Sequence, residues 1–174
     1  MLWDHGAGWV GYGVDEFGES PELLDLPDVT AEIAGGLADA GLTKFDLVGF
    51  DACLMSTYEV AAALAPSTNY LVASQELVPG HGWDYRAFQV LIDQPGAGPD
   101  VLGASILSGF YDYSQTEGTG DNITMALMDL RQLDGLTAAL DVWGAQVSAD
   151  MSRFAPLLGR DRATSCLLYT SRCV

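Results

Sequence analysis

The chain has 174 residues and a mass of 18.5 kDa, a size that fits a single domain. Hydrophobic residues make up 49 % of it, which is enough to build a core and excludes an intrinsically disordered chain. Seven Lys and Arg residues against 24 Asp and Glu residues give a net charge of −17, which disfavours nucleic acids and anionic lipids and favours cationic ligands.

The two ends of the chain differ from its middle. Leu2 and Trp3 are typical of the end of a strand, and turn-forming glycines follow at once, so we expect an N-terminally truncated fragment. Residues 160–174 carry three arginines, one aspartate and two of the three cysteines. We therefore assign a domain to residues 1–159 and expect a non-native or disordered tail at 160–174. We expect no membrane span, signal peptide or disulfide scaffold.

Predicted strands and helices alternate between these ends. In chain order we expect a strand stump at 2–3, a glycine-rich loop at 6–18, a helix at 28–40, a strand at 45–50, a helix at 54–65, a strand at 70–74, helices at 84–92 and 99–113, a strand at 123–130 and a helix at 133–147. Asp28 is the expected cap of the first helix, and Gly41 its stop. The order predicts an α/β layered fold with a largely parallel sheet whose first strands are missing.

A glycine motif at the start of the chain resembles a dinucleotide-binding fingerprint. Gly6, Gly8 and Gly11 fit the spacing G-x-G-x-x-G and follow a strand. That site needs a helix to begin inside the motif, because the helix N-terminus holds the pyrophosphate. The residues that follow here are typical of a loop, and the chain is strongly acidic. The motif therefore argues weakly for a nucleotide-dependent oxidoreductase.

Cys53 occupies a position where chemistry is common. It follows the strand 45–50 and comes just before the helix expected from Leu54, at the carboxyl end of a predicted parallel strand. A helix N-terminus beside a thiol favours the thiolate. The other interpretation is a cysteine that only packs in the core, as many do.

The two histidines differ in their surroundings. His5 follows the strand stump, so the carboxyl ends of two neighbouring strands can bring it beside Cys53. An imidazole there can stabilise a thiolate and protonate a leaving amine. It can also be a strand-end histidine bonded to the backbone. His81 lies in a Pro-Gly-His-Gly turn, and we interpret it as a turn residue.

Asp51 lies two residues before Cys53, so in an extended segment both side chains point to the same face. A carboxylate there can form the floor of a pocket for a cationic side chain. It can equally cap the helix that follows.

Several blocks of this sequence together resemble the clostripain family of cysteine peptidases. The blocks are Trp3–Trp9, Phe45–Met55, Glu59–Ala61, Val72–Glu76 and Pro79–Tyr85. Their order and spacing are kept over about residues 1–130, and joint agreement is far more specific than a lone H-G or D-A-C. Caspases, gingipains and legumains are more distant relatives with an H-G and a D/A-C at two strand ends.

The resemblance implies a caspase-like α/β/α sandwich and a Cys–His dyad. Cys53 would be the nucleophile that forms a thioester, and His5 the general acid that protonates the leaving amine. The backbone N–H groups of Gly6 and Cys53 would form the oxyanion hole. Asp51 would lie in the S1 pocket, which fits cleavage after Arg or Lys. Asp4 belongs to the motif, and we expect it to satisfy loop N–H groups.

The same resemblance implies a monomer that acts on peptides or proteins with basic residues and is secreted or at the cell surface. No cofactor is required. Calcium stays open, because Asp15, Glu16 and Glu19 form an acidic loop that lacks EF-hand spacing. Lys44 is the only basic residue between His5 and Cys53, so we predict no self-cleavage within residues 6–43.

One departure from the family pattern leaves an alternative open. The family has sheet strands before the histidine block, and this chain lacks them, so the fragment can be inactive although its family is active. The alternative is a non-catalytic caspase-like domain that binds cationic peptides through its acidic surface.

Overall fold

The structure is a computed structural model that describes residues 1–15 and 22–164, with side chains described as far as residue 157. The chain divides into two compact units, Met1–Arg131 and Gln132–Val174. Within the described part of the chain, no helix combines the length and the apolar character needed to cross a membrane.

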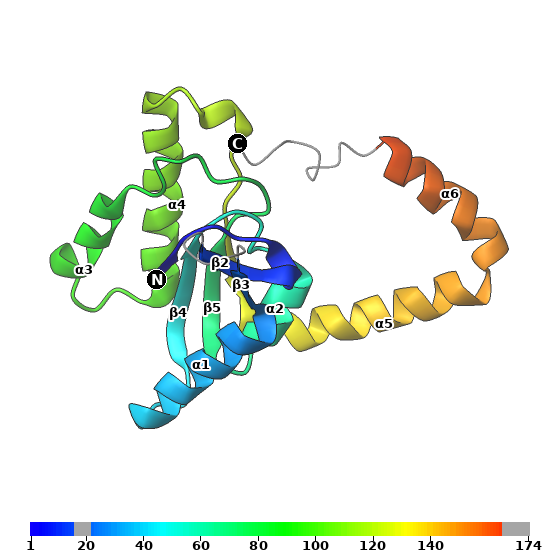
Figure 1. Ribbon diagram of the computed structural model, residues 1–174, viewed down its shortest axis with the longest axis horizontal. Coiled ribbons are helices and arrows are strands. Elements are labelled where there is room, and N and C mark those ends of the chain that lie inside the picture. The colour runs from blue at the N-terminus through cyan, green and yellow to red at the C-terminus, as the bar shows by residue number, and fades with distance from the viewer. Residues whose placement is uncertain (16–21, 165–174) are drawn as a thin grey trace. The chain divides into compact units, whose positions relative to one another are not determined.

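The larger unit is built on a four-stranded sheet in the order β1-β4-β5-β6 (Figure 1). The strands β1 (Leu2–Trp3), β4 (Phe45–Asp51) and β5 (Thr68–Ala73) run parallel, whereas β6 (Ala126–Asp129) is antiparallel to β5. The mostly parallel sheet expected from the sequence is therefore confirmed.

The last strand is shorter than the 123–130 expected from the sequence, and it runs against its neighbour. Its start is fixed beside the end of β5, where Ala126 is the register partner of Ala73. Just before that point, the hydroxyl groups of Ser74 and Thr124 are 2.9 Å apart and hydrogen bonded. The chain thus enters β6 at the edge of the sheet where β5 leaves it, so β6 must run in the opposite direction.

The stretch expected to be a glycine-rich loop contains ordered structure instead. A short 3-10 helix, η1 (Gly8–Val10), leads into an antiparallel pair of strands, β2 (Gly11–Asp15) and β3 (Glu22–Asp25). A Cβ on Gly11 would lie 2.1 Å from the carbonyl oxygen of Leu24, so only glycine lets the two strands approach this closely. Glycine is depleted in strands, which is why the pattern indicated a loop.

The first helix, α1 (Leu26–Asp39), begins earlier than expected. Its N-cap is Asp25, whose Oδ1 accepts a hydrogen bond from the N–H of Asp28 at 2.8 Å. Asp28 was the wrong choice of cap because Pro27 fits the first turn of a helix, and the helix therefore starts one turn before the position that Asp28 marked. Gly41 follows the helix end with φ +67°, as a C-terminal glycine is expected to do.

The remaining helices of this unit follow the predicted order with shifted boundaries. The expected helix at 84–92 is a 3-10 helix, η2 (Tyr85–Gln89), followed by one turn of α-helix, α3 (Val90–Asp93). The helix α4 runs over Pro99–Thr116 and is followed by η3 (Gly120–Asn122); η4 (Leu130–Gln132) follows β6. The helix α2 (Tyr58–Leu64) starts later than expected, with Thr57 as its N-cap.

Helices cover both faces of the sheet, which makes the three-layer sandwich (Figure 1). On the α4 face, a cluster of buried side chains comprises Val72, Trp83, Ala87, Ile106 and Phe110. Alternate residues of β4 serve the two faces. Val48 faces the α1 side, whereas a Cβ on Gly49 would lie 2.8 Å from the Trp83 ring on the α4 side. Asp51, two residues on, is consequently directed to the same face as Trp83.

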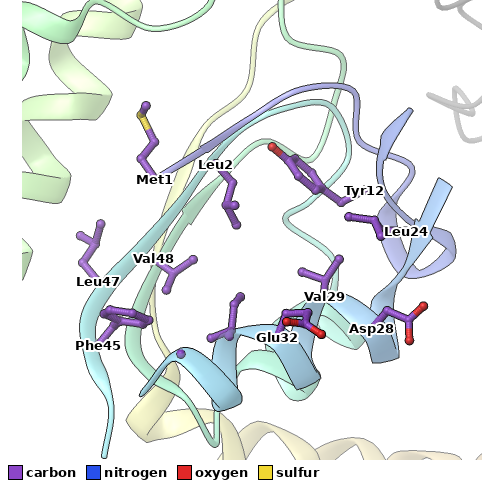
Figure 2. A pocket seen from close by; sticks show the side chains of 12 residues that line it. Met1, Leu2, Tyr12, Leu24, Asp28, Val29, Glu32, Phe45, Leu47 and Val48 are labelled. Carbon is purple, nitrogen blue, oxygen red and sulfur yellow. The ribbon is translucent and has the colours of Figure 1, made fainter. Parts of the chain in front are cut away.

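A cavity of about 410 Å³ lies between α1 and the sheet (Figure 2). Apolar side chains such as Leu2, Val29 and Val48 line it, and Figure 2 shows the carboxylates of Asp28 and Glu32 on its helix side. Its lining carries no thiol, imidazole or hydroxyl nucleophile other than the phenol of Tyr12. The cavity is thus a gap in the apolar layer, and the candidate chemistry lies at the carboxyl ends of the strands.

The smaller unit consists of α5 (Leu133–Ala149) and α6 (Met151–Thr164). The helix expected at 133–147 is confirmed. Of its apolar stripe Val147 is buried, while Leu136, Leu140 and Trp143 are exposed. Most of the tail expected at 160–174 lies outside the described residues. This part is residues 165–174, which include Cys166 and Cys173.

The cap of α1 can be tested with two matched substitutions. Asp25→Ala removes the acceptor for the N–H of Asp28 and should lower the free energy of unfolding by about 1 kcal/mol. Asp28→Ala keeps that N–H and loses only a first-turn charge, so its effect should be about half as large or smaller. Urea denaturation of both variants measures the difference, and a larger loss for Asp28→Ala would show that the sequence-based cap was right.

Candidate active site

The ends of two neighbouring parallel strands place the main candidates together. In β1 and β4, Leu2 pairs with Phe50 and Trp3 with Asp51, so both strands end at the same edge of the sheet. His5 comes two residues after β1, and Cys53 two residues after β4. Both line one cavity of about 280 Å³, whose other lining residues are Trp3, Asp4, Asp51, Ala52, Val78, Pro79, Gly80 and Gly82.

The loops that carry His5 and Cys53 touch through their backbones. A Cβ on Gly6 would lie 2.1 Å from the carbonyl oxygen of Cys53 and 2.9 Å from Cγ of Met55. No residue with a side chain fits there without a shift of the backbone. The glycine after His5 thus sets how closely the two loops approach.

The backbone of His5 is held on both sides while its side chain is exposed. Its N–H donates to Oδ1 of Asp4 at 2.6 Å, and its carbonyl accepts from the N–H of Gly13 at 2.9 Å. Asp4 therefore does what we expected of it, since it accepts a hydrogen bond from a loop N–H. These two bonds fix the point from which the imidazole enters the cavity.

Cys53 does not lie at a helix N-terminus, which corrects the expectation from the sequence. Residues 54–57 form an irregular segment before α2, in which Leu54 has φ +63°. The Leu54 N–H donates to the carbonyl of Glu76 at 3.0 Å, and the Ser56 N–H to that of Ser74 at 2.9 Å. These bonds to the segment after β5 draw the chain away from a helical path, so the dipole of α2 begins one turn beyond the thiol.

A backbone amide, and not a helix N-terminus, is the group that contacts the sulfur of Cys53. The N–H of Val78 donates to Sγ of Cys53 at 3.3 Å, and the Val78 carbonyl lies 3.9 Å from the same sulfur. The shorter contact, in which the amide donates to sulfur, favours the thiolate, whereas the longer contact, in which the thiol would donate to the carbonyl, favours the thiol. Sequence reasoning missed Val78 because any residue can supply a backbone N–H.

The segment that carries Val78 is itself anchored at both ends. At one end, the N–H of Glu76 donates to Oγ of Ser74 at 3.1 Å and to Oγ1 of Thr124 at 2.9 Å. At the other end, Nε2 of His81 is 2.9 Å from Oγ1 of Thr119, and the His81 ring meets Tyr113 edge-on at 4.8 Å. His81 is therefore a structural turn residue, as interpreted from the sequence.

Asp51 is a buried carboxylate with an uneven set of partners. Its side chain is 3 % exposed, and its Oδ2 accepts from the Trp83 N–H at 2.9 Å and from the Tyr85 hydroxyl at 2.7 Å. Within residues 1–15 and 22–164, its Oδ1 has no hydrogen-bond partner. A Cβ on Gly82 would lie 2.6 Å from Oδ2, so glycine keeps the space beside the carboxylate open. Sequence reasoning gave Tyr85 no role, although it lies in one of the family-like blocks.

Burial and nearby negative charge raise the pKa values of two neighbouring phenols, those of Tyr12 and Tyr85. Burial, reinforced by the charges of Asp4 and Asp51, raises the pKa of Tyr12 to about 12. Burial and then the hydrogen bond to Asp51 raise the pKa of Tyr85. Both phenols therefore stay neutral at physiological pH, and the Tyr85 hydroxyl remains a donor to Asp51.

The expected calcium loop falls only in part within the described chain. Asp15 is at the end of β2, whereas Glu16 and Glu19 lie outside the described residues. Among the residues that the structure describes, no group of three or more His, Cys, Asp and Glu side chains could hold a metal ion. Calcium binding therefore stays open, as it was from the sequence.

Comparisons with known proteins identify the family of the chain. The model of the clostripain family matches residues 1–166. A secreted C11 cysteine protease from Bacteroides thetaiotaomicron, solved with an irreversible peptide inhibitor, is 25 % identical with a TM-score of 0.61; the match covers 79 % of this chain and 40 % of that one. No curated protein shows a significant sequence match.

Two further solved structures are similar. A clostripain from Bacteroides thetaiotaomicron with the peptide inhibitor BTN-VLTK-AOMK is 29 % identical with a TM-score of 0.54, over 70 % of this chain and 49 % of that one. An inactive zymogen C11 protease from Parabacteroides distasonis is 28 % identical with a TM-score of 0.50, over 79 % of this chain and 35 % of that one.

This chain thus spans less than half the length of each of the three proteins. The match to the family model nevertheless extends over nearly all of it. The chain belongs to the clostripain family.

Proposed function

We propose that this chain carries the catalytic site of a cysteine endopeptidase that cleaves peptide bonds after Lys or Arg. One observation carries the proposal: a thiol, an imidazole and a buried carboxylate, from Cys53, His5 and Asp51, line the same cavity at the carboxyl edge of the sheet. A nucleophile, a general acid and a cation-binding group are the three parts that such a reaction needs.

The reaction has two covalent steps. The thiolate of Cys53 attacks the carbonyl carbon of the scissile peptide bond and forms a tetrahedral intermediate with a negatively charged oxygen. Collapse of the intermediate breaks the C–N bond, and the imidazolium of His5 gives its proton to the leaving amine. Water then hydrolyses the thioester, which releases the acid product and returns the thiol.

Backbone groups of the two touching loops are the candidates for stabilising the oxyanion. We assign this role to the N–H groups of Gly6 and Cys53, because Gly6 packs directly on the Cys53 carbonyl, which brings both peptide planes to the same wall of the site. The Val78 N–H supports the nucleophile from the other side by donating to Sγ.

Asp51 provides the preference for a basic side chain. Its carboxylate is buried beside the nucleophile and keeps one oxygen without a partner among the described residues. Such a group gains most from a cation, because an ammonium or guanidinium both neutralises the charge and supplies the missing hydrogen bonds. The substrates are therefore peptides or proteins with Lys or Arg.

Two further properties are proposed from the family. One similar protein is described as secreted, and we propose that this protein is exported too. That it acts as a monomer is a proposal from the family resemblance alone. No activating cut is expected within residues 6–43. Lys44 borders that stretch, and its Nζ donates to the carbonyl of Ala65 at 2.6 Å, which keeps its side chain away from a protease subsite.

Covalent labelling tests the nucleophile and separates a peptidase from a domain that only binds cationic peptides. A peptide with a C-terminal Lys or Arg acyloxymethyl ketone should alkylate the chain at Cys53, because only an activated thiolate displaces its leaving group. Cys53→Ala should abolish labelling and peptide hydrolysis, whereas Cys166→Ala should change neither. If mass spectrometry showed that Cys53→Ala and Cys166→Ala reduce labelling equally, the assignment of Cys53 as the nucleophile would be wrong.

The close approach of the two loops gives a second test. Gly6→Ala places a methyl group on the Cys53 carbonyl and should move His5 away from the thiol, lowering kcat/KM by on the order of 100-fold. Gly35→Ala is the matched control: it lies in α1 with nothing within 4 Å of the added carbon, so activity should not change. Unchanged activity in Gly6→Ala would contradict the dyad geometry.

The role of Asp51 can be tested by removing its charge alone. Asp51→Asn keeps the size of the side chain and an acceptor for Trp83 and Tyr85. We expect kcat/KM for Lys and Arg peptides to fall by on the order of 100-fold, since a buried charge-assisted contact is lost. Hydrolysis of a matched norleucine peptide should be retained. A parallel fall for all three peptides would assign Asp51 to the support of the fold.

A further inference from the structure

Both donors that reach the Asp51 carboxylate bind the same oxygen. The Trp83 N–H and the Tyr85 hydroxyl lie 2.9 and 2.7 Å from Oδ2, whereas Oδ1 has no partner in the described part of the chain. A carboxylate oxygen has two favourable acceptor directions, so these donors fill Oδ2. Oδ1 is itself buried, and it is the oxygen of this cavity-lining residue that is left to accept a hydrogen bond from a bound ligand.

Lysine and arginine make different demands on such a group. An ammonium is a compact point charge that binds well to a single oxygen. A guanidinium binds a carboxylate most strongly through two parallel N–H···O bonds, which require one acceptor direction on each oxygen. A carboxylate with one oxygen already occupied by two donors thus cannot form the two parallel N–H···O bonds through which arginine binds most strongly.

We propose that Tyr85 is a positioning residue that makes the Asp51 subsite prefer the ammonium of lysine over the guanidinium of arginine. This inference rests on the proposed function and states which of the two basic side chains the subsite takes. Tyr85 is not among the residues that line the cavity, so it acts through Asp51 and does not touch the substrate.

Of the two donors, only the hydroxyl can be removed by a conservative substitution. The Trp83 donor is a backbone N–H, which every substitution except proline leaves in place. The Tyr85 ring packs parallel to Phe88, with an interplanar angle of 23° and 6.3 Å between centroids, and the residue is 45 % exposed. Tyr85→Phe keeps this stacking and deletes only the hydroxyl, which opens one direction on Oδ2.

The experiment measures binding, so it does not depend on turnover. In the full chain carrying Cys53→Ala, the dissociation constants of three short peptides that differ only in a C-terminal Lys, Arg or norleucine are measured by NMR titration. The Lys peptide should bind more tightly than the Arg peptide. Adding Tyr85→Phe should shift the Lys-to-Arg ratio toward arginine by about tenfold, which corresponds to about 1.4 kcal/mol.

A surface phenol provides the matched control. Tyr111→Phe removes a hydroxyl from a residue of α4 that is 57 % exposed, and the ratio should not change. A general loss of stability lowers the affinity for both peptides equally and leaves their ratio unchanged. The ratio therefore separates a positioning role from a structural one, and thermal melts verify that both variants are folded.

Each outcome decides the matter. A ratio in Tyr85→Phe that stays within about twofold of that of the parent overturns the inference. So does binding of the Lys and Arg peptides no tighter than that of the norleucine peptide. If the ratio shifts as expected but Cys53 is not alkylated by the ketone probe, the peptidase proposal fails while the assignment of Tyr85 stands.

Discussion

The parallel pairing of β1 with β4 is the constraint on which the site depends. Because Trp3 lies beside Asp51 in that pair, the residues two positions beyond each strand leave the sheet together. Gly6 then allows the loops to touch, since its missing side chain is the space that the Cys53 carbonyl occupies. Backbone geometry thus brings a thiol and an imidazole to one cavity from positions 48 residues apart.

The segment after β5 completes what the two strand ends begin. Residues 76–82 cross the site, where they donate an N–H to the thiol and leave room beside the buried carboxylate. Hydroxyl groups of Thr124 and Thr119 hold this segment from the far part of the same unit. The sulfur of Cys53 is therefore held by a main-chain N–H, and this contact depends on the fixed path of a loop.

Asp51 shows how a carboxylate can be buried without being fully neutralised. Two donors on one oxygen hold the group in place, and the other oxygen has no partner among the described residues. The net charge of the whole chain, −17, has the same sign as this carboxylate.

The order of strands and helices, the helix stop at Gly41 and the choice of His5, Cys53 and Asp51 as candidates could all be read from the sequence, because periodicity, turn residues and motif spacing are local signals. The start of α2, the β2–β3 pair, the direction of β6 and the contacts of Val78 with Cys53 and of Tyr85 with Asp51 could not. Each depends on a partner distant in the chain: Glu76 for Leu54, Leu24 for Gly11, Thr124 for Ser74. Only tertiary structure creates these contacts. A backbone donor such as the Val78 N–H cannot be identified from the sequence, because it does not depend on the type of side chain.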